Sequence, residues 1–266
     1  MRFFLTVFLS LLLAFPANKA RCEETIEGFT YLRQETYSCN GQEHTVKEYL
    51  HNQTGLEFIL IPGGSFMMGG NIHEDEKPVH KVILSSFLMA KYELTQEVWE
   101  KFMGNNPSFF KDSKKLPVEC ISWYDCKEFC DKTLLDFPTE AQWEYACRAG
   151  STTEYFWGNS LDGTYLWYNH NSGFRTHPVG QKKPNAFGLY DISGNVWEWC
   201  KDTKTNYTSD EQTDPLNTSG ISRILRSGGW SRSDGCRSAI RDGNSPVDKY
   251  NNIGFRPALH YTKKNK

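Results

Sequence analysis

The sequence predicts a single α+β domain that is rich in irregular structure. Three short helices with clear capping residues lie between Thr95 and Gly150, and short apolar strand segments stand on either side of them. After Gly150 the hydrophobic period is lost, and Gly, Asn, Asp and Pro recur every few residues, as they do in loops. No repeat, linker or block of charge divides the chain, so one mixed domain is the simplest interpretation.

The N-terminus has the composition of a secretory signal peptide over residues 1–20. Arg2 supplies a positive charge, residues 3–15 are apolar, and Ala20 is a small residue at a cleavage position. The apolar run is too short to cross a bilayer comfortably, and no later segment could do so. A retained anchor helix is the alternative. We expect a secreted or periplasmic protein with no membrane span after signal cleavage.

The mature chain divides into an extension, a main domain and a tail. Residues 21–55 are polar and lack a clear period, which indicates an N-terminal extension; a hairpin closed by Cys22 and Cys39 is one possible arrangement. Residues 56–260 form the main domain, and residues 261–266 form a short basic tail. The whole chain has 30 basic and 32 acidic side chains. Without a basic excess to neutralise phosphates, we expect no nucleic-acid partner.

Strands are predicted where short apolar or alternating runs meet turn residues. Two of them flank the turn Pro62-Gly63-Gly64, a third follows soon after, and two more come late in the chain. The predicted strands cover residues 58–61, 65–69, 79–84, 224–226 and 253–259.

Three helices are predicted from residues that cap a helix N-terminus. The first begins at Thr95. The second begins at Ser122, with Asp125 three residues further on. The third begins at Thr139 and has Gln142 three residues on, the spacing of a capping box.

The eight cysteines have no pairing that the sequence alone fixes. Export favours disulfides, but eight cysteines allow about 105 complete pairings. Cys126 and Cys130 lie four residues apart, which would suit one face of a helix. We interpret them as half-cystines or buried thiols, because no second close Cys or His pair completes a zinc site.

A series of segments resembles the sulfatase-modifying factor family, which includes the formylglycine-generating enzymes. They occur in order over about residues 56–259 and include the strand-turn Ile61–Gly69, the signature segment Phe137–Ala146 and the stretch Asn185–Trp199. The other segments are residues 76–80, 92–99, 116–125, 226–230, 244–246 and 252–256. The resemblance implies a variant C-type-lectin-like α+β fold, often with structural calcium.

The resemblance implies a calcium site on Asp191, Gly194, Val196 and Glu198. Asp191 and Glu198 would supply carboxylate oxygens, and the other two would supply backbone carbonyls, as a hard cation with about 6–8 oxygen ligands requires. The alternative is a cation-free loop in which Glu198 caps backbone amides. A second family site would begin near Asn169, and we leave it open.

The enzymes of this family oxidise a sulfatase cysteine to formylglycine with oxygen and copper(I). Copper(I) is soft and prefers thiolates, and those enzymes hold it with two cysteines that follow a Gly-Gly-Ser motif. Here the matching region contains only Cys236. The resemblance would pair Cys236 with Cys147 in a structural disulfide, with Cys200 as a rival partner. We therefore expect neither copper binding nor oxidase chemistry.

Iron-dependent sulfoxide synthases share this fold, but the chain has no His-x-x-x-Glu-x-His motif, so we exclude that chemistry as well.

No residue is assigned a catalytic role, and any function is expected in the groove that binds substrate in the oxidases. Its candidate residues are Trp230, Ser231, Arg232, Ser233 and Asp234.

Other rings in the loop-rich region could belong to such a groove or simply to the core. They are Trp157, Tyr165, Trp167 and Tyr168.

We expect an exported accessory module that binds a peptide, a protein or a glycan and carries structural calcium. The alternatives are a periplasmic maturation enzyme of the same family without copper, of the siderophore type or another, and, less favoured, a formylglycine-generating oxidase.

Overall fold

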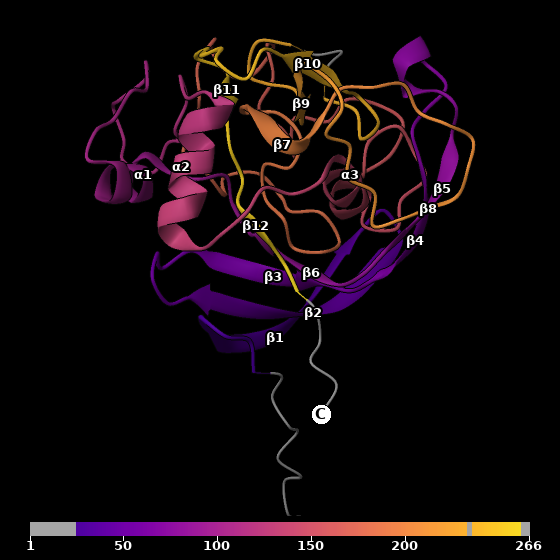
Figure 1. The fold of residues 1–266 in the computed structure, drawn as a ribbon, viewed down its shortest axis with the longest axis horizontal. Coiled ribbons are helices and arrows are strands. Elements are labelled where there is room, and N and C mark those ends of the chain that lie inside the picture. Colours follow the sequence, from indigo (N-terminus) through magenta and orange to yellow (C-terminus); the bar gives the residue numbers. More distant parts are fainter. Residues whose placement is uncertain (1–24, 233–235, 262–266) are drawn as a thin grey trace, which may run out of the picture.

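The computed structural model describes residues 25–232 and 236–261. In this part of the chain three β-sheets and three α-helices surround a core that many irregular segments cross (Figure 1). The α+β class and the loop-rich character predicted from the sequence are both confirmed. None of the helices described here is long and apolar enough to span a membrane.

The largest sheet has five antiparallel strands in the order β1-β2-β3-β6-β12. They are β1 (Phe29–Cys39), β2 (Gln42–His51), β3 (Glu57–Ile61), β6 (Phe87–Ala90) and β12 (Ala258–His260). A two-residue Asn40-Gly41 turn, with both residues at positive φ, joins β1 to β2, as a tight hairpin requires. The segment expected as an extension thus forms a hairpin whose second strand pairs with β3. Cys22, its proposed clasp, lies outside the described residues.

The hairpin is fixed to the loop that precedes β7. Gly188 leaves room for the Tyr37 ring of β1, because a Cβ at this position would overlap the ring. The Tyr37 hydroxyl donates to Glu48 Oε1 at 2.5 Å, and Lys91 Nζ donates to both Glu48 oxygens at 3.0 Å. One buried carboxylate therefore connects β1, β2 and the segment after β6.

The other two sheets are mixed. One has the order β4-β5-β8, and the other has the order β10-β9-β7-β11. Their strands are β4 (Gly64–Met68), β5 (His80–Leu84), β8 (Gln212–Thr213), β10 (Asp242–Asn244), β9 (Arg223–Arg226), β7 (Trp197–Thr203) and β11 (Ile253–Gly254). The strands expected near residues 58–61, 65–69, 79–84 and 224–226 are confirmed. The run 253–259, expected as one strand, is divided between β11 and β12 in different sheets, and Pro257 between them has no N–H to donate.

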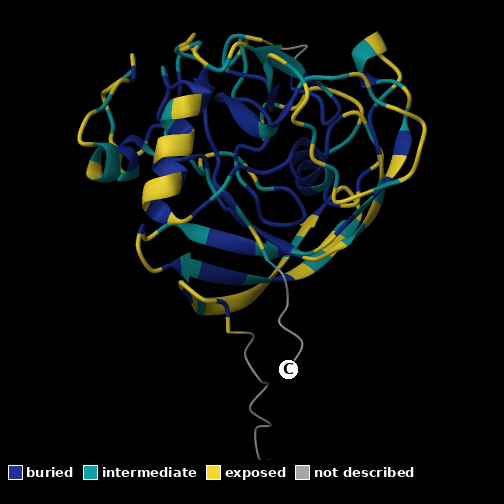
Figure 2. Cartoon of the chain, in the orientation of Figure 1, coloured by how far each residue is buried: buried dark blue, intermediate teal, exposed yellow. Residues whose placement is uncertain are grey.

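The three helices begin where their caps predicted. They are α1 (Gln96–Met103), α2 (Trp123–Thr133) and α3 (Glu140–Arg148), with a 3-10 turn, η1 (Glu74–Glu76), ahead of them. Ser122 with Asp125, and Thr139 with Gln142, both form complete capping boxes. Thr95 stands at the N-cap of α1, but its side chain makes no capping hydrogen bond. One face of α2 is exposed and the other faces the core (Figure 2).

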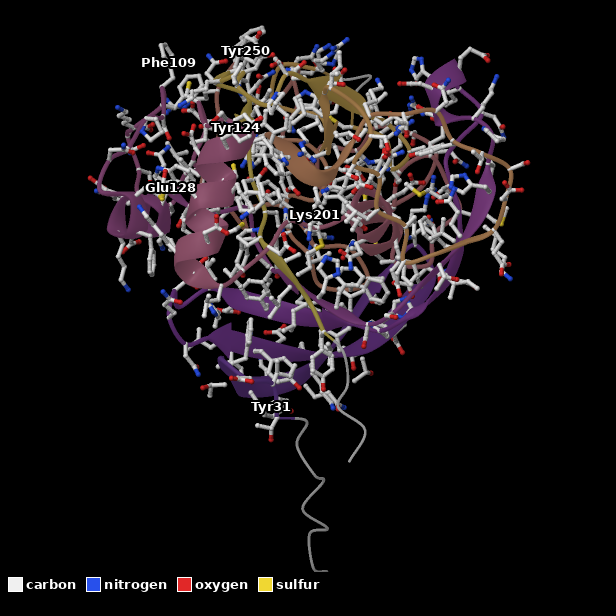
Figure 3. The ribbon with its side chains drawn as sticks, viewed as in Figure 1. Tyr31, Phe109, Tyr124, Glu128, Lys201 and Tyr250 are labelled. Atoms are coloured by element: carbon white, nitrogen blue, oxygen red, sulfur yellow. The ribbon has the colours of Figure 1, made fainter. Side chains whose placement is uncertain are left out.

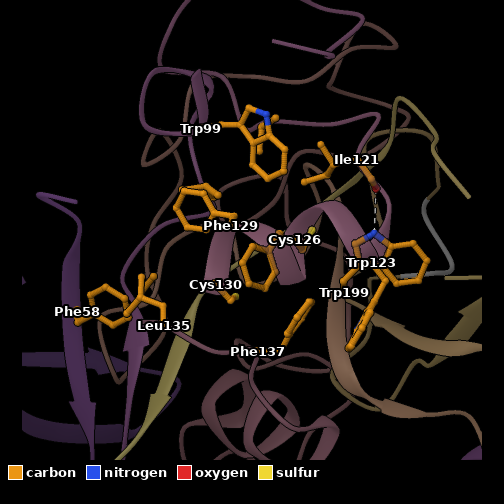
Figure 4. Close-up of a cluster of buried hydrophobic side chains, with 14 of the residues drawn as sticks. Phe58, Trp99, Ile121, Trp123, Cys126, Phe129, Cys130, Leu135, Phe137 and Trp199 are labelled. Carbon is orange, nitrogen blue, oxygen red and sulfur yellow. Dashed lines mark hydrogen bonds between the residues drawn. The ribbon is translucent and has the colours of Figure 1, made fainter. Parts of the chain in front are cut away.

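Aromatic rings dominate the core beneath α1 and α2. Trp99 stacks on Phe129 with ring centres 5.8 Å apart, and Trp123 stacks on Phe137 at 4.7 Å (Figure 4). Trp199 donates its indole N–H to the carbonyl of Ile121 at 3.1 Å. Rings of this size bury much apolar area while their N–H groups stay hydrogen-bonded.

Cys126 and Cys130 are free, buried thiols in this aromatic cluster. Burial raises the pKa of both thiols, so neither is a ready metal ligand. Among the described residues, no group of three or more His, Cys, Asp or Glu side chains is placed to hold a metal ion. The pair therefore serves the packing of α2.

Helix α3 is held by buried charges. Glu144, which is fully buried, accepts from Arg226 at 2.5 Å and from Arg148 at 2.8 Å. Burial alone would raise the pKa of Glu144, but the two guanidinium groups outweigh it and lower that pKa. One turn earlier, Glu140 accepts from Arg241 at 2.7 Å. The acidic positions of the Thr139–Arg148 signature thus join the helix to β9 and to the chain beyond it.

Asp202, near the end of strand β7, caps the N-terminus of α3. Its carboxylate accepts from the backbone N–H of Glu140 at 2.8 Å and of Asn217 at 3.0 Å. Burial, followed by the negative charge of Glu140, raises the pKa of Asp202 to about 7. In the unfolded chain the same group titrates near pH 3.8.

The raised pKa of Asp202 makes stability depend on pH. The folded state retains the proton that the unfolded state loses, so the contribution is complete below about pH 4 and is lost as the pH rises through about 7. We expect the unfolding free energy, measured by urea denaturation, to fall less steeply between pH 5 and 8 in Asp202→Asn than in the wild type. Asp210→Asn, at an exposed position, should retain the wild-type slope, and an unchanged slope in Asp202→Asn would contradict the assignment.

Candidate functional site

Trp230 lies at the meeting point of three loops just after β9. Its indole N–H donates to the carbonyl of Asn251 at 3.1 Å, and its own carbonyl accepts from the hydroxyl of Ser172 at 2.9 Å. Its ring meets Phe110 edge to face at 5.8 Å. The loops containing residues 105–112, 172–177 and 245–252 are therefore each tied to this one residue.

Each of these loops exposes apolar side chains. Phe109 is 69% exposed, Phe174 is 70% exposed, Val247 is 63% exposed and Tyr250 is 51% exposed. Phe109 and Tyr250 lie at the same end of the molecule, as Figure 3 shows. We call these four residues, with Trp230, the Trp230 face. Exposed apolar groups gathered in this way are typical of interaction sites.

The structure places three of the five predicted groove residues on this face. Ser231 follows Trp230 and accepts a hydrogen bond from Asn252 at 3.4 Å. Arg232 is exposed, and its backbone N–H donates to the carbonyl of Gly229. Ser233 and Asp234 lie outside the described residues.

Of the other predicted rings, Trp157 and Tyr165 form a stack, whereas Trp167 is joined to the Trp230 loop because the backbone of Asn195 bonds to both Trp167 and Trp230. Trp157 stacks parallel to Tyr165 with ring centres 5.3 Å apart, and Tyr155 stacks on Trp157 at 4.8 Å. Trp167 stacks on His177 at 3.7 Å and has Lys182 Nζ 3.7 Å from its ring centre. Because these rings pack against one another or against neighbouring charges, they support the loops rather than offer open faces.

The predicted calcium residues lie together around a buried charge cluster. Asp191 is buried; one of its oxygens accepts from the N–H of Gly180 at 2.6 Å, and the other has no hydrogen-bond partner within the described chain. Burial raises the pKa of Asp191 to about 6. The carbonyl of Gly194 accepts from the hydroxyl of Ser227 at 3.1 Å.

The backbone N–H of Val196 and the carboxylate of Glu198 both form hydrogen bonds inside the protein. The backbone N–H of Val196 donates to Glu93 Oε1 at 3.1 Å. Glu198 accepts from Arg256 at 2.8 Å and from the indole N–H of Trp143 at 2.7 Å. The oxygens of Glu198 are thus already occupied, whereas Asp191 keeps one oxygen available.

Glu93 is a buried member of this cluster that the sequence patterns did not single out. Its second oxygen accepts from the Asn195 side chain at 2.6 Å. Burial, then the charges of Asp191 and Glu198, raises the pKa of Glu93 well above its usual range. Glu93, Asp191 and Glu198 form one buried cluster with Arg256, and the unpartnered oxygen of Asp191 is the position in it that could accept a cation. The sequence identified Thr95, in the same Tyr92–Trp99 segment, as a helix cap. It gave no sign of the role of Glu93, because the partners Asn195 and Val196 are far away in sequence.

Asn169, where a second family cation site would begin, also has a buried side-chain oxygen with no hydrogen-bond partner in the described residues.

The implied bridge between Cys147 and Cys236 is not formed in the structure. Cys147 is a buried free thiol whose sulfur lies 3.7 Å from the hydroxyl of Ser238 and 3.9 Å from that of Ser193. Cys236, two residues earlier, packs with Tyr155 and Leu166, and its sulfur donates to the carbonyl of Arg232 at 3.4 Å. The rival partner Cys200 is also a buried free thiol. Cys236 and Ser238 lie only two residues apart in an irregular loop but face different neighbours, so the family resemblance could not show which of them meets Cys147.

The contact between Cys147 and Ser238 predicts an engineered bridge. Ser238→Cys would place a second sulfur opposite Cys147 across 91 residues of chain, a loop closure that stabilises by about 2–4 kcal/mol. After air oxidation and denaturation, we expect one fewer free thiol in this variant than in the wild type, together with a higher melting temperature. The exposed control Ser219→Cys should show one more thiol than the wild type. An oxidised Ser238→Cys protein with one extra thiol would contradict the geometry.

Comparison with known proteins agrees with this architecture. The family model described as "Sulfatase-modifying factor enzyme 1-like domain" matches residues 43–261. Mouse formylglycine-generating enzyme is 30% identical, with 77% of this chain and 75% of the mouse protein covered. The protein named "Inactive C-alpha-formylglycine-generating enzyme 2" from Bos taurus is 34% identical, with 79% and 90% covered. "Chaperone protein LppX" from Paenibacillus barcinonensis is 31% identical, with 65% and 78% covered.

Among solved structures, Treponema denticola variable protein 1 superposes with a TM-score of 0.70 and 31% identity, covering 86% of this chain and 99% of that one. PvdO from Pseudomonas aeruginosa gives a TM-score of 0.70 and 25% identity, with 80% and 98% covered. The buried signature of α3, the Asp191–Glu198 cluster and the Gly-Gly turn before Trp230 all lie within the matched range. The chain therefore belongs to the sulfatase-modifying factor family.

Proposed function

We propose that this chain is an exported accessory module that binds a polypeptide segment on the Trp230 face and has no copper oxidase chemistry. The observation that carries the proposal is the set of four exposed apolar side chains around Trp230, in the place that the family resemblance gives to substrate. Apolar surface of this kind is stabilised when a partner covers it.

A polypeptide suits this face better than a glycan. The exposed groups are mainly Phe and Val side chains, which offer contact area but no hydrogen bonds to sugar hydroxyls. The neighbouring polar groups of Ser172 and Ser231 already hydrogen-bond within the protein. A related protein is named a chaperone, which supports a role in handling polypeptides.

The cysteine arrangement supports the lack of oxidase chemistry. One cysteine, Cys236, stands between Gly228 and Ala239, whereas a soft monovalent metal would need two thiolates there. A relative that is similar over most of its length carries the word "inactive" in its name, which supports retention of this fold without the activity.

The Trp230 face can be tested with a permanently unfolded polypeptide, reduced and carboxymethylated α-lactalbumin. We expect the double variant Phe109→Ser, Phe174→Ser to bind this polypeptide about tenfold more weakly than the wild type. Burying each ring contributes at most about 1.5–3 kcal/mol to the binding free energy, and the costs of association offset part of that gain. Leu134→Ser, equally exposed but at the far end of α2, serves as the matched control and should bind as the wild type does.

Two outcomes would contradict this proposal. Glycan-array binding that the double variant loses, with no polypeptide binding, would assign the face to glycans. Tight uptake of one equivalent of copper(I) by two thiolates in an anaerobic titration would restore the oxidase interpretation.

Structural calcium beside Asp191 is part of the same proposal, supported by the buried oxygen of Asp191 that has no hydrogen-bond partner in the described residues. Calcium at about 100 times its dissociation constant adds about 2.7 kcal/mol to stability. We expect the melting temperature to be roughly 5–10 °C higher in calcium chloride than in EGTA, and this difference to shrink in Asp191→Asn. Asp210→Asn should keep the difference. Equal melting temperatures in calcium and EGTA would rule out the site.

A further inference from the structure

A gap separates the start of β2 from β4. β2 pairs with β3 as far as Lys47 opposite Leu60. Beyond that point Pro62-Gly63 redirects the chain, and β4 pairs with β5 instead of continuing along β2. In the described chain, residues 42–46 of β2 therefore pair with β1 on one side and with no strand on the other.

A pocket of about 660 Å³ lies in this gap. The consecutive residues Ser65, Phe66 and Met67 of β4 line it, and His44 of β2 lines it as well. Successive side chains of a strand point to opposite faces, so a pocket that runs along the edge of the strand accounts for a lining of three consecutive residues. β4 is the outer strand of its sheet, so its unpaired edge borders the pocket.

The pocket has an aromatic wall. The Phe66 ring lies 5.4 Å from the Tyr145 ring, which lies 5.8 Å from the Phe187 ring, and His44 packs on Phe187 at 4.4 Å. Met67 and Ile72 are exposed at its margin. This wall has the size and chemistry to receive one apolar side chain.

Of the arginine and glutamate side chains that line the pocket, only Glu154 is exposed. Arg237 and Arg148 are buried: Arg237 is paired with Glu76 at 2.6 Å, and Arg148 shares the Glu144 carboxylate with Arg226. The exposed carboxylate of Glu154 forms no ion pair within the described residues. A ligand with a positive charge would therefore be preferred.

We propose that this pocket binds an extended, cationic peptide segment as an additional strand along β4. The peptide backbone pairs with the free edge of β4, one apolar side chain enters the wall of Phe66, Tyr145 and Phe187, and a Lys or Arg side chain lies beside Glu154. Main-chain hydrogen bonds supply affinity in this mode and the side-chain pockets supply specificity. The site is separate from the Trp230 face and does not depend on the function proposed for that face.

The test uses the full chain and acetylated nonapeptides of alternating Thr and Val with a central Phe and a Lys two positions on. Hydrogen exchange of the segment 64–70 reports pairing directly, because the β4 amides that face the free edge exchange quickly until a strand covers them, whereas Gly69 and Gly70 already donate to Glu144 and Glu76. We expect at least tenfold slower exchange in this segment when the peptide is bound.

Matched variants and peptides separate this mode from general stickiness. Glu154→Gln should weaken binding about three- to tenfold, and replacement of the peptide Lys by norleucine should have a similar effect. Glu128→Gln, an exposed acidic residue on α2 (Figure 3), should change nothing. N-methylation of alternate peptide amides should abolish binding in one of the two possible registers.

Two results would overturn the proposal. One is no protection of residues 64–70 by any peptide of this set at 1 mM. The other is equal binding by both N-methylated registers, which would show that no strand pairing occurs. Binding should also be unchanged in the Phe109→Ser, Phe174→Ser double variant; loss there would place the peptide on the Trp230 face instead.

Discussion

The contact between Glu144 and Arg226 organises the functional side of this molecule. Both side chains are fully buried, and Arg226 also donates to the carbonyls of Ser238 and Ala239. One guanidinium group therefore holds the beginning and the end of the loop that carries Trp230. Breaking a buried pair of this kind leaves an uncompensated charge in the core, which typically costs about 3–5 kcal/mol. The candidate groove thus depends on a side chain that never touches a ligand.

This dependence shows that the family architecture is supported by side chains outside the loop that follows the Gly-Gly turn. The family segments that are most recognisable in the sequence, around Thr139–Arg148 and Asn185–Trp199, supply buried carboxylates, caps and indole donors. They specify a scaffold, whereas the metal-binding cysteines of the oxidases belong to a short loop after the Gly-Gly turn. The supporting charges therefore do not depend on which residues that loop carries.

The features that could be predicted from the sequence are those set by interactions between residues close together in the chain. Capping boxes at Ser122 and Thr139 lie within four residues of their partners, so the helix starts could be located without tertiary information. The role of Glu93 could not be, because its partners Asn195 and Val196 are about a hundred residues away. The same holds for β7, which pairs with β9 only once the intervening loops have folded. It also holds for Cys147, which contacts Ser238 rather than Cys236. Exposure of Phe109 and Phe174 likewise follows from packing rather than pattern.

The close approach of the Tyr37 ring to Gly188 couples two regions that a domain boundary would have separated. Position 188 admits no side chain while the ring stands over it, and the ring is anchored in turn through Glu48 to Lys91. Sequence drift at either position is therefore constrained by the other, so a shorter residue at 37 would be a precondition for any larger residue at 188. A segment 56–260 without its hairpin would leave this loop uncovered, because the Tyr37 ring packs over Gly188.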